Sequence, residues 1–108
     1  MPFSVLMTHD AAQDLQEIYE YIAAQDSPQK ADHLLHRIEK AFLSLHDFPD
    51  RGAYLKELLA LGIREYREIF FKPYRIVYRV MGKSVYVMLI SNGRRDMQSL
   101  LQRRLLEG

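Results

Sequence analysis

Arginines placed inside predicted strands are the residues of this chain best suited to binding chemistry. Arg75 and Arg79 lie four residues apart in a stretch where polar and aliphatic residues alternate, and Arg94 and Arg95 follow the next such stretch. Side chains separated by an even number of positions lie on one face of a strand, so we expect Arg75 and Arg79 to point outward together. A sheet face that carries guanidinium groups attracts an anionic partner, either a nucleic acid or an acidic protein segment.

The charge of the chain is divided unevenly between its two halves. The sequence has 108 residues and a net charge of +1, but residues 1–63 hold five Lys or Arg against ten acids, and residues 64–108 hold ten against four. The halves therefore carry −5 and +6. A basic C-terminal half favours a binding role for the strand arginines, although arginines on strands also protect sheet edges and improve solubility. Both interpretations stay open for Arg75 and Arg79.

Composition excludes several classes of protein. A chain of 108 residues is long enough for one core, so we expect a single domain over residues 1–108. The absence of cysteine excludes disulfides and thiolate chemistry, and His33 and His36 lack a Cys or acidic set to complete a metal site. We expect no metal and no cofactor. The sequence shows neither a signal peptide nor a membrane-spanning stretch, which predicts a cytoplasmic protein without membrane contact.

A short strand and an amphipathic helix are predicted at the N-terminus. Apolar and polar residues alternate over residues 3–7, and Thr8 offers a side-chain oxygen that can cap the helix that follows. Apolar residues then recur at three- and four-residue spacing over residues 15–22. The outer face of this helix is predicted to be solvated and carries the acids Asp14, Glu17 and Glu20.

A second helix is predicted to form an antiparallel hairpin with the first. Ser27 can cap this helix, and Pro28 is tolerated at its first position because proline lacks a backbone donor that would be unpaired there. Pro49 forces the helix to end. Residues 47–62 are interpreted as a connection with room for a helical turn near residues 58–61.

Three strands and a short helix are predicted in the C-terminal half. The apolar period becomes two, which predicts strands over residues 63–71, 74–80 and 85–90 in an antiparallel meander. The first of these strands has apolar residues on both faces, so its inward face is ambiguous. Asp96 can cap a last helix, whose buried side is marked by Met97, Leu100, Leu101 and Leu105.

The predicted fold class is α+β. Its elements are an N-terminal strand, a two-helix hairpin packed on a curved antiparallel three-stranded meander, and a short C-terminal helix. The hairpin is expected to cover one face of the sheet. The other face, which carries Arg75 and Arg79, is expected to be open to solvent or to a partner.

Several stretches of this sequence resemble the ParE/RelE superfamily of bacterial toxins. They are the run Tyr-Arg-Ile-Val-Tyr-Arg-Val at 74–80, the strand at 85–90 and the ending Gly-Arg-Arg-Asp-Met at 93–97. The first helix is similar as well, through the pattern Ala11, Ala12, Asp14, Leu15, Ile18 and Tyr21. The resemblance covers nearly the whole chain and its order of elements, and it implies the ParE/RelE fold.

The resemblance implies the toxin component of a type II toxin-antitoxin system. In such a system a ParD-like or similar antitoxin wraps the toxin and blocks its action, so a hetero-oligomer with the antitoxin is expected. Two activities are known within the superfamily. RelE-like members cut messenger RNA in the ribosomal A site with basic residues and usually a tyrosine, and ParE-like members inhibit DNA gyrase without that set.

The residues that match the RelE-like catalytic set are incomplete in this chain. The two lysines on the strand before the Tyr-Arg motif correspond to Tyr66 and Glu68, and the late tyrosine falls near Leu101. Only the two arginines are kept, as Arg75 and Arg95. Glu68 would repel the phosphate that a lysine attracts, which disfavours the metal-independent endoribonuclease. The nuclease is not excluded, because Lys72, Arg67 or Tyr66 could occupy the space of the missing lysines. If the protein is that nuclease, Arg75 and Arg95 would act with Tyr66 as the acid or base.

The ParE-like ending is matched better, so we predict gyrase inhibition by binding and without covalent chemistry. A RelE-like nuclease with a divergent catalytic set and a toxin fold that has lost its toxicity stay as alternatives. The antitoxin's identity is also open. The partner-binding residues predicted on this basis are Arg75, Arg79, Arg94, Arg95, Met97 and Leu101.

Overall fold

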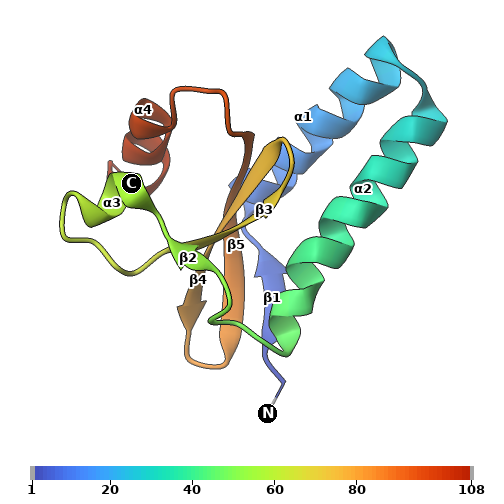
Figure 1. Ribbon diagram of the computed structural model, residues 1–108. Coiled ribbons are helices and arrows are strands. Elements are labelled where there is room, and N and C mark those ends of the chain that lie inside the picture. The colour runs from blue at the N-terminus through green and yellow to red at the C-terminus, as the bar shows by residue number, and fades with distance from the viewer. Residues whose placement is uncertain (1, 108) are drawn as a thin grey trace.

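A five-stranded sheet with helices on both faces forms the centre of this protein (Figure 1). The computed structural model describes residues 2–107. The strand order is β1-β5-β4-β3-β2, in which β1 pairs with β5 in parallel and the other neighbours are antiparallel. The elements are β1 (Ser4–Met7), α1 (His9–Gln25), α2 (Pro28–Leu43), the 3-10 turn η1 (Ser44–His46), β2 (Ala53–Tyr54), α3 (Lys56–Leu59), β3 (Arg67–Phe71), β4 (Tyr74–Met81), β5 (Ser84–Asn92), α4 (Met97–Leu101) and the π-helical turn η2 (Gln102–Leu106).

The predicted fold class, helix hairpin and meander are confirmed, and two further strands extend the sheet. β1 adds a parallel strand beside β5, and the two-residue β2 adds an antiparallel strand beside β3. No helix within residues 2–107 combines the length and the apolar character needed to cross a bilayer.

Side-chain oxygens cap the helices where the sequence predicts them. The Thr8 Oγ1 accepts the Ala11 N–H at 3.1 Å, and the Ser27 Oγ accepts the Lys30 N–H at 3.1 Å. Each bond satisfies a backbone donor that has no partner within its own helix. Asp96 likewise caps α4 through its Oδ1, which accepts an N–H from the first turn at 3.2 Å.

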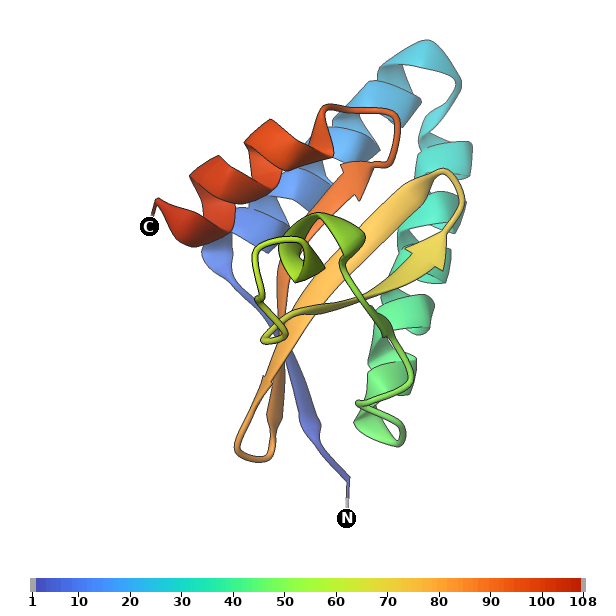
Figure 2. The same cartoon turned by 60° about the vertical axis from the view of Figure 1, so that its left-hand side comes forward.

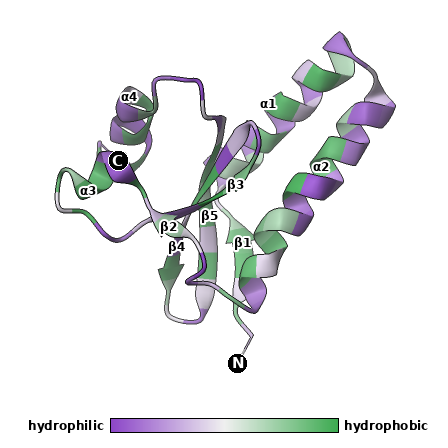
Figure 3. Ribbon diagram, viewed as in Figure 1, coloured by the Kyte–Doolittle hydropathy of each residue, from purple (hydrophilic) through white to green (hydrophobic). Residues whose placement is uncertain are grey.

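The larger core lies between the sheet and the α1–α2 hairpin. Green and purple segments follow one another along both helices, because apolar residues face the sheet and polar residues face solvent (Figure 3). Burial of these apolar groups is the main driving force that holds the hairpin on the sheet. The buried members of this core are Ala11, Leu15, Ile38, Phe42, Leu45, Ile69, Tyr74, Ile76, Tyr78, Val85, Val87 and Ile90.

A second core covers the opposite face of the sheet, so the prediction of an open face was wrong. Val77 is 0% exposed on this face, and α3 and α4 lie against it (Figure 2). The physical reason is that Val77 and Leu89 are apolar and would otherwise meet water on a central part of the sheet. The buried members of this second core are Leu55, Leu58, Tyr66, Val77, Leu89, Met97, Leu100 and Leu101.

The connection before β3 is more structured than its sequence indicates. The helical turn α3 begins two residues earlier than predicted and is closed by a bond from the Ile63 N–H to the Leu58 carbonyl at 2.9 Å. Gly62 permits this reversal because its φ is +76°, a conformation that other residues rarely adopt. β3 therefore begins at Arg67 instead of Ile63.

Two hydrogen bonds join His46 to Phe3 at the outer edge of the sheet, just before β1. The Phe3 N–H donates to the His46 carbonyl at 2.9 Å, and the Nδ1 of His46 donates to the Phe3 carbonyl at 2.8 Å. The N–H groups of Ser4 and Thr8 instead point inward and bond to the β5 side. His46 of η1 thus pairs with the residue just before β1, on the outer side of that strand.

The C-terminal turn η2 is fastened to α1 by one arginine. The two terminal nitrogens of Arg104 donate to the two carboxylate oxygens of Asp14, each at 2.9 Å, and one of them also donates to the Met88 carbonyl at 3.1 Å. Asp14 accepts the Ile90 N–H as well, at 3.0 Å. The prediction that Asp14 is merely solvated was therefore wrong, because Arg104 reaches it from a distant part of the chain.

Replacing Arg104 by Ala is expected to cost about 2 kcal/mol of unfolding free energy, because a bidentate, mostly buried carboxylate loses its partner. Urea denaturation measures the loss, and hydrogen exchange should locate the greater opening in residues 97–106. Arg103→Ala removes the neighbouring exposed arginine and should change the free energy by less than about 0.5 kcal/mol. Equal effects of the two substitutions would contradict the proposal that the Arg104–Asp14 ion pair holds η2 against α1.

Candidate partner-binding site

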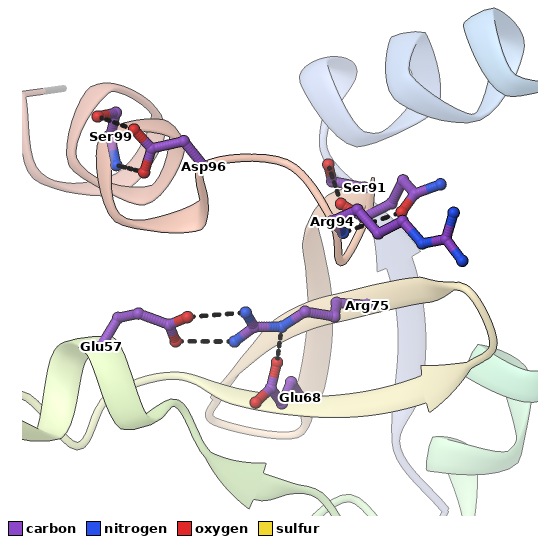
Figure 4. Close-up of polar contacts among 8 residues, drawn as sticks. Glu57, Glu68, Arg75, Ser91, Arg94, Asp96 and Ser99 are labelled. Carbon is purple, nitrogen blue, oxygen red and sulfur yellow. Dashed lines mark hydrogen bonds and ion pairs between the residues drawn. The ribbon is translucent and has the colours of Figure 1, made fainter.

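Arg75 is buried in a cluster with two carboxylates. Its side chain is 9% exposed, its Nε donates to Glu68 at 2.6 Å, and its two terminal nitrogens donate to Glu57 at 2.8 Å each (Figure 4). The prediction that Arg75 points outward into solvent was wrong. It projects to the predicted face of the sheet, but α3 covers that face and brings Glu57 onto the guanidinium.

The charges in this cluster stabilise one another. The pKa of Glu57 lies below its ordinary value, chiefly because Arg75 donates hydrogen bonds to its carboxylate and despite the opposing effect of burial. The pKa of Arg75 is raised, first by its two bonds to Glu57 and also by its one bond to Glu68. Because two carboxylates surround one guanidinium, the cluster presents a net charge of −1 and no free cation.

Arg79 is the more accessible of the two strand arginines. Its side chain is 36% exposed, it lies 3.7 Å from the Glu65 carboxylate, and its guanidinium sits 5.7 Å from the centre of the Tyr66 ring. Tyr66 is 7% exposed because Arg79 and the second core cover it. The guanidinium of Arg79 is therefore accessible to a partner, whereas Tyr66 packs in the second core.

Arg94 and Arg95 lie exposed on the turn between β5 and α4. The Arg94 N–H donates to the Asn92 side chain at 2.9 Å and the Arg95 N–H donates to the Asn92 carbonyl at 3.2 Å, so the backbone of the turn is fixed. Within residues 2–107, neither guanidinium comes within 4.0 Å of a carboxylate. The turn holds two unneutralised cations, and in Figure 4 the Arg94 side chain points away from Glu57.

Arg95 stands at the rim of a cleft between α1 and the end of β5. The cleft has a volume of about 410 Å³, and its walls include Ile18, Tyr21, Tyr74 and Ile90. Tyr21 is 62% exposed, so an aromatic surface is already accessible beside the cation. Burial raises the pKa of Tyr74, which keeps its phenol neutral. This combination of an arginine and aromatic rings suits contact with a protein.

The residues predicted for a nuclease do not line one common hollow. Arg75 lines a different hollow, of about 360 Å³, on the side of the sheet with Tyr54, Lys56 and Phe70. Arg95 and Tyr66 do not line that hollow, and Arg75 and Tyr66 do not line the Arg95 cleft. Within residues 2–107, no three His, Cys, Asp or Glu side chains are grouped in a way that could hold a metal ion.

Met97 and Leu101 belong to the second core. They are 5% and 1% exposed, which confirms the predicted buried side of the last helix. A partner could contact them only after α4 moves away from the sheet, so their role in partner binding stays a prediction. Sequence reasoning missed Glu57 and Asp14, because the partner of each lies far along the chain and no local pattern signals the pairing.

The fold defined by these elements occurs in known bacterial toxins. A chain of the chromosomal ParDE system from P. aeruginosa superposes with a TM-score of 0.71 at 23% identity, covering 83% of this chain and 95% of that one. A chain of the RelBE2 toxin-antitoxin complex from Mycobacterium tuberculosis gives 0.58 at 22% identity, with 85% and 92% covered. A mutant of the E. coli toxin RelE in the free state gives 0.64 at 14% identity, with 97% and 100% covered. The chain therefore has the same fold as these proteins.

The sequence comparison identifies the family of this chain. Toxin ParE3 of Caulobacter vibrioides is 27% identical over 100 residues, which cover 93% of this chain and 96% of that protein. Residues 5–97 match the family described as ParE toxin of type II toxin-antitoxin system, parDE. The chain belongs to this family of ParE toxins.

Proposed function

We propose that this toxin is neutralised by a cognate ParD-like antitoxin and that, when free, it inhibits DNA gyrase by binding. The observation that carries the choice of target is the buried cluster around Arg75. An arginine held by Glu57 and Glu68 serves the structure of the protein and leaves no free guanidinium for a scissile phosphate. The proposed site of action is the cytoplasm, where gyrase and its DNA are found.

The same cluster weighs against the alternative of a ribosome-dependent nuclease. Cleavage of RNA without a metal needs cations that converge on the phosphate and an acid or base beside them. Here Glu68 stands where RelE-like members have a lysine, and its carboxylate lies 2.6 Å from Arg75. An approaching phosphate would find the Arg75 guanidinium already bound by two carboxylates, which would have to be displaced first.

The binding surface proposed for gyrase or the antitoxin is the exposed part of the predicted set. Arg94 and Arg95 provide two unneutralised cations, and Arg79 provides a third that is partly accessible. The cleft beside Arg95 adds the exposed ring of Tyr21. Complementary charge mainly accelerates association and fixes register, while the aromatic contact contributes affinity. The complex with the antitoxin is proposed to be a hetero-oligomer.

Two assays on purified protein test the target. We expect the protein to inhibit supercoiling by gyrase and to leave ribosome-bound messenger RNA intact. Arg95→Glu should weaken the inhibition at least about tenfold without a change in Tm, because the residue is exposed and its charge contributes little to folding. Lys83→Glu, which makes the same charge change on the β4–β5 turn, is the matched control and should leave the inhibition unchanged.

The opposite pattern would overturn the proposal. Cleavage of messenger RNA with normal supercoiling would establish the nuclease. Inactivity in both assays, together with tight binding of the antitoxin, would identify a toxin fold that has lost its toxicity.

A further inference from the structure

A hollow between α2 and the β3–β4 turn gathers basic side chains. Its volume is about 620 Å³. Figure 2 shows the β3–β4 turn close to α2. Lys30, His33 and Arg37 line it from one face of α2, because residues three and four positions apart lie above one another on a helix. Lys72 lines it from the turn. We call this hollow the α2 groove.

The cations of the α2 groove are not neutralised by its own walls. Its remaining lining residues are Gln29, Leu34 and Phe71, so no acid lines it. Lys30 pairs only with Asp26, at 3.3 Å and in an exposed position where such a pair contributes little. Within residues 2–107, no carboxylate comes within 4.0 Å of Arg37 or Lys72. This contrasts with Arg75, whose charge is fully compensated.

The floor of the groove is apolar and partly accessible. Leu34 and Phe71 are half-buried there, and both pack against the larger core. The Arg37 guanidinium lies 5.0 Å from the centre of the Phe71 ring and covers its face. The groove thus combines accessible cations at its rim with an aliphatic and aromatic base.

We propose that the α2 groove binds an acidic segment of a protein partner, with an apolar side chain of the segment on Leu34 and its carboxylates on Arg37 and Lys72. Lys30 and Arg37 are seven residues apart, which is about 10 Å along a helix. Three residues of extended chain span the same distance, so one short segment can reach both ends of the row. Arg37 can hold a carboxylate through two parallel hydrogen bonds.

A protein segment fits this groove better than a nucleic acid does. Binding of single strands relies on bases that stack on free aromatic faces, and Arg37 already occupies the face of Phe71. Leu34 offers nothing to a phosphate, but it can bury the aliphatic side chain of a peptide. The proposal concerns α2 and Lys72, so it holds whether or not gyrase is the target of the Arg95 surface.

A synthetic peptide tests this inference directly. The probe is a fluorescein-labelled peptide of about ten residues, in which every second residue is Ser and the positions between are Asp and Leu in turn. Its binding is measured by fluorescence anisotropy at low salt. We expect binding that weakens as salt is raised, since exposed charges are screened. Arg37→Glu and Lys72→Glu should each weaken it at least about tenfold. Lys83→Glu makes the same change in net charge on a distant turn and should leave it unchanged.

Amide shifts of the isotope-labelled protein on addition of the peptide should concentrate on residues 29–37 and 71–72. Thermal unfolding of each variant confirms that it is folded. Failure of the peptide to bind, or equal weakening by Lys83→Glu, would overturn the proposal. Tighter binding of a single-stranded oligonucleotide of similar length at the same amides would assign the groove to nucleic acid instead.

Discussion

Arg75→Met is expected to destabilise the protein by about 4 kcal/mol. The substitution keeps most of the side-chain volume but leaves Glu57 and Glu68 without their shared cation in a largely buried place. Removing one partner of a buried ion pair is far more costly than replacing the whole group, because the remaining charge stays desolvated. Urea denaturation at neutral pH measures the effect through the shift of the midpoint.

The control for this prediction is Arg79→Met on the same strand. Arg79 is partly exposed and its contact with Glu65 is long, so the cost should stay below about 1 kcal/mol. Combining Arg75→Met with Glu57→Gln and Glu68→Gln should recover a large part of the loss, since no charge then remains buried. A similar cost for both arginines, or no recovery in the combined variant, would contradict the proposed role of the cluster.

The loss of unfolding free energy at acid pH gives a second test of the Arg75 cluster. The pKa of Glu57 is lower in the folded protein than in the unfolded chain, mainly because Arg75 donates to it. Its contribution is therefore complete above its ordinary pKa of 4.5 and is lost as the pH falls through the lower, folded-state value. The difference in unfolding free energy between the wild type and Glu57→Gln should therefore become smaller as the pH falls through that range, and urea denaturation at a series of pH values measures it.

Gly52→Ala is expected to cost about 3 kcal/mol. A Cβ at this position would lie 2.6 Å from the Tyr78 hydroxyl and 2.7 Å from the Glu68 carbonyl, and neither is the end of a flexible side chain. Tyr78 is fully buried, donates to the Pro49 carbonyl at 2.6 Å and accepts the Gly52 N–H at 3.0 Å. The backbone must shift and both bonds weaken, so overpacking and lost hydrogen bonding add together.

Gly93→Ala is the matched control for Gly52→Ala. Its Cβ would meet Arg75 and the Pro73 carbonyl at 3.4 Å or more, close to ordinary contact, so the cost should stay below about 1 kcal/mol. Tyr78→Phe isolates the hydrogen-bonding part and should cost about 1–2 kcal/mol. Thermal unfolding and urea midpoints of the three variants measure these losses of stability. A stable Gly52→Ala protein would show that the loop before β2 can move freely.

Local signals in the sequence predicted much of the fold. The caps at Thr8, Ser27 and Asp96 each depend on one side chain and a neighbouring N–H, so they could be identified without knowing the rest of the structure. The meander followed from alternation along the chain. β2 has two residues and β1 pairs in parallel with a strand about eighty positions away, so neither pairing leaves a local pattern.

The error about the arginine face had a physical origin. Alternation correctly placed Arg75 and Val77 on the face away from the α1–α2 hairpin, but it says nothing about what covers that face. Over Arg75 the cover comes from α3, a helix of four residues that is too short to show a helical period. Glu57 lies in that helix, so the acid that neutralises Arg75 could not be assigned from the sequence.

The closure of β1 by His46 bears on how the molecule behaves at high concentration. An unpaired outer strand invites a second molecule to add its own strand, and repeated addition builds fibres. The Phe3 amide and carbonyl are already occupied, and alternation leaves only the Val5 and Met7 amides of this strand directed away from the sheet. Two donors support too short a ladder for such growth, so one histidine side chain helps to keep neighbouring toxins from stacking edge to edge.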